Sequence, residues 1–143
     1  KKYYLNGDKI QKIMRPKLEE LKNLHKNKIK DLRGTGAMFG FTFHTKYLSV
    51  KKIQKLLPIS VLKDKKFLDK LLASALLDQL YREYKILATL KFNKEIIFCL
   101  EPSLVVTNAE INYCLRSIKK LFNKNFDKII FKFLLGSFRK SFF

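Results

Sequence analysis

Cysteine, proline and glycine are all scarce in this chain of 143 residues. It contains two Cys, three Pro and five Gly. Two cysteines cannot supply the several cross-links of a small disulfide-rich domain. So little proline and glycine excludes collagen-like and low-complexity sequences. Acidic residues are also few. The chain has 12 Asp and Glu against 31 Lys and Arg, which gives a net charge of +19.

Long hydrophobic runs are missing as well. No run of 18 apolar residues occurs, so the sequence predicts no ordinary transmembrane helix. The first residues do not follow the basic-then-apolar pattern of a secretory leader. We expect a cytoplasmic protein. The chain begins at Lys1 and not at Met, so we expect a processed or cut piece, or one shortened for expression.

What the chain does have is enough apolar sequence for a core and a large excess of lysine. Hydrophobic residues make up 47% of the chain, and its length suits one domain. Lysine neutralises phosphates, which suggests polyanion binding. Only five basic residues are Arg and most Phe lie in apolar runs, unlike most nucleic-acid readers. We favour the interpretation that the lysines form a solvated surface. The alternative is that they bind nucleic acid or an anionic membrane.

Hydrophobic periodicity predicts a helix over residues 8–27, with Asp8 as its N-cap. Pro16 lacks a backbone donor and should start or kink this helix. We therefore expect the firm part of the helix to run from about residue 15 to residue 26.

Alternating residues over 38–43 predict a strand that places three phenylalanines on one face: Phe39, Phe41 and Phe43. Gly34 and Gly36 bracket a turn or bulge before this strand. Their spacing resembles a dinucleotide-binding loop only superficially. They lead into a strand, and no strand–loop–helix unit surrounds them, which excludes that loop.

The second half of the chain predicts further helices and a strand pair. A short helix over 49–57 is expected to begin at Ser49 and end at Pro58, and a longer helix is expected over 65–82. Two short apolar runs, 86–90 and 95–100, predict a hairpin or two adjacent strands. The fold class is therefore α+β, with a small antiparallel sheet covered by helices.

The end of the chain begins with the clearest helix start in the sequence. Thr107 and Glu110 have the spacing of a capping box, in which each side chain accepts from the backbone N–H of the other. Residues 123–143 form a basic, aromatic tail with an amphipathic and helical pattern. Its apolar stripe suits packing on a neighbouring domain, or an anionic membrane surface as the alternative.

No catalytic set and no metal site can be assembled from the sequence. His25 and His44 are isolated, and the carboxylates are too scattered for an acid–base pair. Cys99 and Cys114 lack metal-ligand spacing and are expected to be small buried hydrophobes. Glu101, at the end of a strand, is expected to be a structural or interface charge.

Two segments resemble a known family. Residues 29–43 read Ile-Lys-Asp-Leu-Arg-Gly-Thr-Gly-Ala-Met-Phe-Gly-Phe-Thr-Phe and resemble the VRGxGLMxGxEF segment of class III aminotransferases, which depend on pyridoxal phosphate. Residues 97–111 read Ile-Phe-Cys-Leu-Glu-Pro-Ser-Leu-Val-Val-Thr-Asn-Ala-Glu-Ile and resemble the family's (I/L)RxxPPLxIxxxEI segment. The two segments occur in the same order as in the family, and the helices expected on either side of them also match. The resemblance covers roughly residues 8–122 and is looser over 44–90.

The resemblance implies the small C-terminal domain of a fold type I enzyme over residues 1–122, followed by the basic tail 123–143. The parent enzyme would transfer an amino group from an amine or amino acid to a keto acid or aldehyde. Its pyridoxal phosphate would be held by a large domain whose lysine motif this chain lacks. The chain alone is therefore expected neither to bind the cofactor nor to be active. Its implied partners are that large domain and, in the parent, a second copy.

The resemblance also assigns individual residues. The matched structural positions are Arg33, Gly34, Gly36, Gly40, Glu101 and Pro102. Cys99 stands where many members carry an Arg that grips a substrate carboxylate, and cysteine cannot make that two-pronged bond. Either the substrate lacks that carboxylate, as a diamine or aldehyde does, or the copy has decayed. We expect Arg33 to bond the backbone or a domain interface, and no residue is assigned as catalytic.

Overall fold

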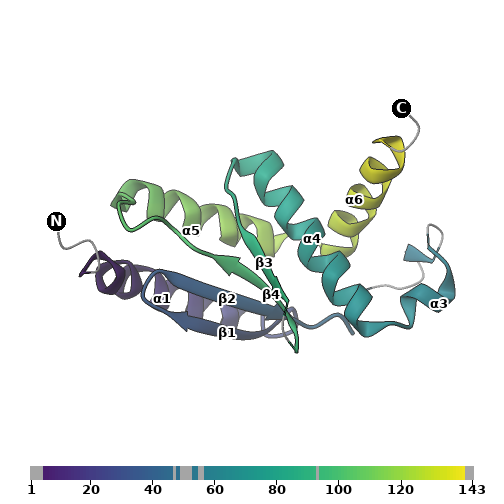
Figure 1. Ribbon diagram of the computed structural model, residues 1–143, viewed down its shortest axis with the longest axis horizontal. Helices are drawn as coiled ribbons and strands as arrows, with labels where there is room; N and C mark the ends of the chain where they lie inside the picture. The colour runs from purple at the N-terminus through teal and green to yellow at the C-terminus, as the bar shows by residue number, and fades with distance from the viewer. Residues whose placement is uncertain (1–4, 47, 49–52, 55–56, 93, 141–143) are drawn as a thin grey trace.

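The chain folds into a four-stranded antiparallel sheet that helices cover on one face (Figure 1). The computed structural model describes residues 5–46, 48, 53–54, 57–92 and 94–140. The strand order is β1-β2-β4-β3, which is the α+β class that the sequence predicts. The elements are α1 (Leu5–Leu24), β1 (Ile29–Thr35), β2 (Met38–Phe43), α3 (Ile59–Leu62), α4 (Lys65–Tyr84), β3 (Thr89–Phe92), β4 (Ile96–Leu100), α5 (Asn108–Asn123) and α6 (Phe126–Lys140).

Helix α1 starts earlier than its sequence pattern predicts and continues through Pro16. The expectation that Pro16 confines the firm helix to residues 15–26 was wrong. Apolar side chains on both sides of the proline are buried along one stripe, while Pro16 itself is exposed. Their burial outweighs the loss of one backbone hydrogen bond. Asp8 consequently lies in the first turn of the helix and not at its N-cap.

Strand β1 was missing from the sequence prediction, which placed only a turn or bulge before β2. The pairing of β1 with β2 is irregular between Ile29 and Asp31. That bulge shifts the buried positions to Ile29 and Leu32, a spacing of three and not of two. The β1–β2 pair is therefore a hairpin that closes at Gly36 and Ala37.

The core lies between the sheet and its helices. Phe39 and Phe41 of β2 are fully buried, as the alternation predicts for this face. The ring of Phe41 meets that of Phe122 in α5 edge-on, with centroids 5.3 Å apart. Phe43 meets the ring of Phe126 at 5.9 Å in the same geometry. Phenylalanines thus join β2 to both C-terminal helices.

The second half follows the predictions closely. Helix α4 and the β3–β4 hairpin are confirmed, although β3 starts at Thr89, after the apolar residues 86–88. The capping box at Thr107 and Glu110 is complete, with both reciprocal hydrogen bonds formed. The short helix predicted over 49–57 lies mostly outside the described residues.

Helix α6 follows α5 and packs against α4 (Figure 1). Its apolar stripe belongs to the hydrophobic core, which buries Phe126, Ile129, Ile130 and Leu134. The stripe therefore packs against other elements of this chain. No helix of the described residues is long and apolar enough to cross a membrane. The proposed division at residue 122 stays a prediction.

Candidate functional site

The two family-like segments lie next to each other in the sheet. Arg33 of β1 is paired with Gly40 of β2, and Gly40 is paired with Cys99 of β4. Cys99 is in turn paired with Thr89 of β3. Directly opposed residues place their side chains on the same face of a sheet. We call this face, opposite the phenylalanine-packed one, the open face. It carries Arg33, Gly40, Cys99, Thr89 and the residues two positions from each along the strands.

Gly40 is the middle one of three β2 residues that pair with β4. A β-carbon there would stand 2.6 Å from Cγ2 of Ile97 and 3.8 Å from Sγ of Cys99. The Ile97 side chain therefore occupies the space above the glycine backbone. Any larger residue at position 40 would displace Ile97, which gives a packing reason for this glycine.

Arg33 is held by carboxylates on its own sheet. Its Nε donates to Oδ2 of Asp31 at 2.6 Å, and its Nη2 donates to Oε2 of Glu95 at 3.2 Å. Lys30 also forms an ion pair with Glu95. The Arg33 hydrogen bond lowers the pKa of Asp31, and that of Lys30 lowers the pKa of Glu95. Arg33 is thus already matched with acceptors and belongs to a network that joins β1 to the start of β4.

The glycine turn next to Arg33 is anchored to α1. Gly34 has φ +133°, and a β-carbon there would lie 1.9 Å from the carbonyl oxygen of Met38, so only glycine fits. The Gly34 carbonyl accepts from Nη1 of Arg15 at 2.7 Å. The side-chain oxygen of Gln11 accepts from the backbone N–H of Gly36. Sequence reasoning missed Arg15 and Gln11, because nothing separates them from the other polar positions of α1.

Cys99 is a buried, neutral thiol at the centre of the open face. Cys99 is only 5% exposed, and this burial raises the pKa of its thiol. Lys91 donates to Glu101, which also accepts from Oγ1 of Thr89 at 2.9 Å. The Lys91 hydrogen bond lowers the pKa of Glu101. The charges around Cys99 are therefore matched between β3 and the end of β4, and the thiol itself carries none.

The loop that contains Pro102 meets the glycine turn at the N-terminal end of α1. Asn6 donates to the carbonyl of Leu104 at 2.8 Å. A β-carbon on the buried Gly7 would lie 3.8 Å from Cα of Gly36 and 3.9 Å from Leu104. Exposed apolar side chains gather at this end of the molecule: Met38, Leu104 and Val105. The two motifs therefore meet twice, once in the sheet and once at this apolar end.

The open face does not fit pyridoxal phosphate by itself. Its cations are matched with carboxylates, since Arg33 and Lys30 bond Glu95 and Lys91 bonds Glu101. A phosphate and a carbonyl carbon need cations and an amine that are available to them. Within the described part of the chain, no three His, Cys, Asp or Glu residues gather as metal ligands.

Comparisons with known proteins point to one fold. No protein-family model matches the chain, and no curated protein matches its sequence. Among solved structures, one described as a transaminase with L-Ala superposes with a TM-score of 0.55 at 15% identity, over 82% of this chain and 23% of that one. Ornithine delta-aminotransferase from Plasmodium falciparum gives a TM-score of 0.52 at 19% identity, over 86% and 25% of the two chains.

Acetylornithine aminotransferase from Elizabethkingia anophelis gives a TM-score of 0.51 at 21% identity, over 82% of this chain and 23% of that one. The chain therefore spans about a quarter of the length of these structures. At such low identity, the likeness is one of fold. The chain has the α+β fold of one part of these aminotransferases.

Proposed function

We propose that the chain is the C-terminal small domain of a class III aminotransferase-like protein that depends on pyridoxal phosphate. The parent transfers an amino group from an amine or amino acid to a keto acid or aldehyde. The observation that carries the proposal is the pairing of Gly40 with Cys99. It joins the two family-like segments in one sheet, in a fold shared with part of several aminotransferases.

The apolar end of the molecule supports a partner domain of the same protein. Met38, Leu104 and Val105 are exposed there, next to both motifs. Contiguous exposed apolar patches are typical of surfaces that bind another protein or domain. A large domain that covers this end would also account for the chain's span of about a quarter of the matching structures. The parent would act as a homodimer, as the resemblance implies.

The chain's own contribution is to hold one wall of the substrate pocket. The cofactor would supply the electron sink for amino transfer when bound by the large domain. Arg15 and Gln11 hold the glycine turn, and Glu101 holds the end of β4 against β3. These contacts fix the open face before a substrate arrives, which reduces the entropic cost of orienting that substrate.

Cys99 determines which substrates the wall accepts. A neutral, buried thiol offers no charge and no paired donors to a carboxylate. Arg33 does not substitute for the missing arginine, because Asp31 and Glu95 already accept from its guanidinium. We therefore propose a donor or acceptor that lacks a carboxylate at this point, such as a diamine or an aldehyde.

The test uses the parent protein expressed from its complete reading frame. Amino transfer is measured with a diamine donor and with an α-amino acid donor, for the parent and for Cys99→Arg. The arginine should favour the carboxylate donor in kcat/KM by about tenfold or more, since a charge-assisted hydrogen bond is worth roughly 1.5–3 kcal/mol.

Cys99→Ser is the matched control, because it keeps a small neutral side chain and should leave the preference between donors unchanged. Failure of the parent to bind pyridoxal phosphate, together with the absence of amino transfer from either donor, would contradict the proposed activity. Equal preference in the parent and in Cys99→Arg would contradict the role of position 99 alone.

A further inference from the structure

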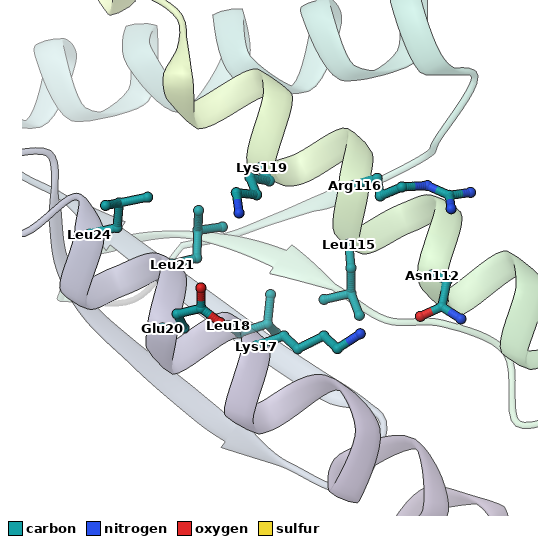
Figure 2. Close-up of a pocket in the computed structure, with 9 residues that line it drawn as sticks. All are labelled: Lys17, Leu18, Glu20, Leu21, Leu24, Asn112, Leu115, Arg116 and Lys119. Atoms are coloured by element: carbon teal, nitrogen blue, oxygen red, sulfur yellow. The ribbon is translucent and has the colours of Figure 1, made fainter.

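A hollow lies in the helical layer, between α1 and α5 (Figure 2). It has a volume of about 340 Å³. Leucines from both helices form its floor: Leu18, Leu21 and Leu115, all buried. Leu24 continues the apolar lining but is 61% exposed. Such a volume falls within the range of about 300–1,000 Å³ that is typical of small-molecule sites lined by apolar side chains.

Cationic side chains reach over this floor from both helices. Figure 2 shows Lys17 extending from α1 toward α5 and Lys119 extending from α5 toward α1, while Arg116 points away from α1. Glu20 is the only carboxylate among the lining residues, and Asn112 adds an amide. Among the described residues, Lys17, Lys119 and Glu20 form no ion pair.

The arrangement differs from the chain's ordinary surface lysines. In a chain of net charge +19 many lysines lack an acidic partner, so an unpaired lysine alone means little. Elsewhere on α1, Arg15 is paired with Glu19 and Lys22 with Asp31. Lys17 and Lys119 instead stand on opposite walls of a leucine-lined hollow. The α1 wall carries both Lys17 and Glu20, and the α5 wall carries Lys119, so the net charge over the apolar floor is positive. This arrangement is complementary to a ligand with an apolar body and an anionic head.

We propose that the α1–α5 cleft binds a small anionic amphiphile, with one carboxylate or phosphate head and an unbranched apolar chain. The chain lies on Leu18, Leu21 and Leu115. The head accepts hydrogen bonds from the ammonium groups of Lys17 and Lys119. A second copy of this protein would bring further positive charge to the cleft and is therefore a poor occupant. The proposal does not depend on the proposed aminotransferase function.

Binding is measured by isothermal titration calorimetry of the 143-residue chain with decanoate and with decyl phosphate, below their micelle concentrations. Acetate, decan-1-ol and decylamine are the comparison probes. At least one anionic amphiphile should bind with a defined stoichiometry of one, and the tighter of the two identifies the preferred head. Acetate should not bind, because it lacks the chain, and decylamine should not bind, because its charge has the wrong sign.

The charge contribution is tested with Lys17→Gln/Lys119→Gln. This variant should weaken binding by about tenfold or more, the loss of one or two charge-assisted hydrogen bonds. The matched control is Lys12→Gln/Lys120→Gln, which removes the same charge from the same two helices outside the cleft and should change affinity less than twofold. Leu24→Gln, at an exposed wall position, should weaken binding several-fold without loss of the fold.

Three results would overturn the proposal. The first is no binding of either anionic amphiphile. The second is equal weakening by the cleft variant and by its control, which would show general attraction to a basic protein. The third is equal binding of decan-1-ol and decanoate by the unmodified chain, which would show an apolar hollow with no use for the cations.

Discussion

The two faces of the one sheet are built from the same four strands but are held together by different interactions. The helix-covered face packs Phe41 edge-on against Phe122, and both rings are fully buried. The open face carries ion pairs instead: Arg33 is paired with Asp31 on its own strand and with Glu95 just before β4, and Lys91 of β3 is paired with Glu101 just after β4. The first face closes the core of this chain. The second is fixed in shape yet presents its polar surface outward, which is the arrangement we propose for a pocket wall.

The difference teaches where stability and function separate along this sequence. Packing of large apolar side chains contributes several kcal/mol per residue, whereas exposed ion pairs contribute little. The helix-covered face should therefore determine whether the chain folds. The exposed ion pairs of the open face should tolerate change in this chain and matter mainly to the parent protein.

The largest effect is expected on the helix-covered face. Phe41→Ala removes a fully buried ring that packs on Phe122 and should cost about 3–5 kcal/mol of unfolding free energy. Met38→Ala, on the same strand but 53% exposed, should cost less than about 1 kcal/mol. Urea denaturation of both variants measures the contrast, and equal losses would contradict the distinction between the faces.

The glycine turn between β1 and β2 comes next. Gly34→Ala forces a β-carbon against the carbonyl oxygen of Met38 at a φ of +133° and should cost about 1–3 kcal/mol. Gly136→Ala is the matched control, because it lies in α6 with nothing within 4 Å of the added carbon. It should stabilise the chain by about 0.5–1 kcal/mol. Thermal unfolding followed by circular dichroism distinguishes the two, and a harmless Gly34→Ala would refute the steric account.

Cys114 on α5 extends the comparison to alkaline pH. Burial raises the pKa of its thiol to about 11. A raised pKa keeps the thiol neutral in the folded chain at a pH where it ionises in the unfolded chain. The thiol's contribution to the unfolding free energy is therefore fully present below about pH 9 and is lost as the pH rises through 11. The loss should be on the order of 2 kcal/mol. Cys114→Ala should lose less stability than the unmodified chain between pH 8 and pH 11, and identical stability profiles of the two in urea titrations would contradict this.

The smallest effect is expected from the ion pairs of the open face. Lys30 and Arg33 lower the pKa of Glu95, so its contribution is present above the ordinary carboxyl pKa and is lost as pH falls below about 4. The contribution should stay below about 1 kcal/mol, because the pair is partly exposed. Glu95→Gln should flatten the acid limb of the stability profile slightly, whereas Glu20→Gln, outside this network, should not. A large effect of Glu95→Gln would mean that the open face carries part of the core's stability.

Much of the fold could be predicted from the sequence wherever one periodicity acts without interruption. The alternation of Phe39, Phe41 and Phe43 and the capping box at Thr107 each follow from local chemistry, and the structure confirms both. Strand β1 could not be predicted, because a bulge destroys its period of two. The length of α1 could not be predicted either, because tertiary packing overrides the penalty of Pro16.

The candidate site divides in the same way. Gly34 could be singled out because its backbone conformation restricts that position to glycine, whereas Gly40 is required by packing against Ile97. The partners of Arg33 could not, because Glu95 lies 62 residues away along the chain. The anchoring of the turn by Arg15 and Gln11 also depends on how α1 packs beside the hairpin, which no local pattern encodes. Pairing between distant strands, and not residue type, brings Cys99 beside Gly40.

The central claim is that this chain closes a pocket whose remaining walls belong to the same protein. The most direct measurement is the reading frame immediately upstream of the Lys1 codon in the source transcript. We expect that frame to continue into a large domain with a cofactor-binding lysine. A stop codon in that frame, or a start codon directly before Lys1, would contradict the claim and leave a chain that folds and acts without that domain.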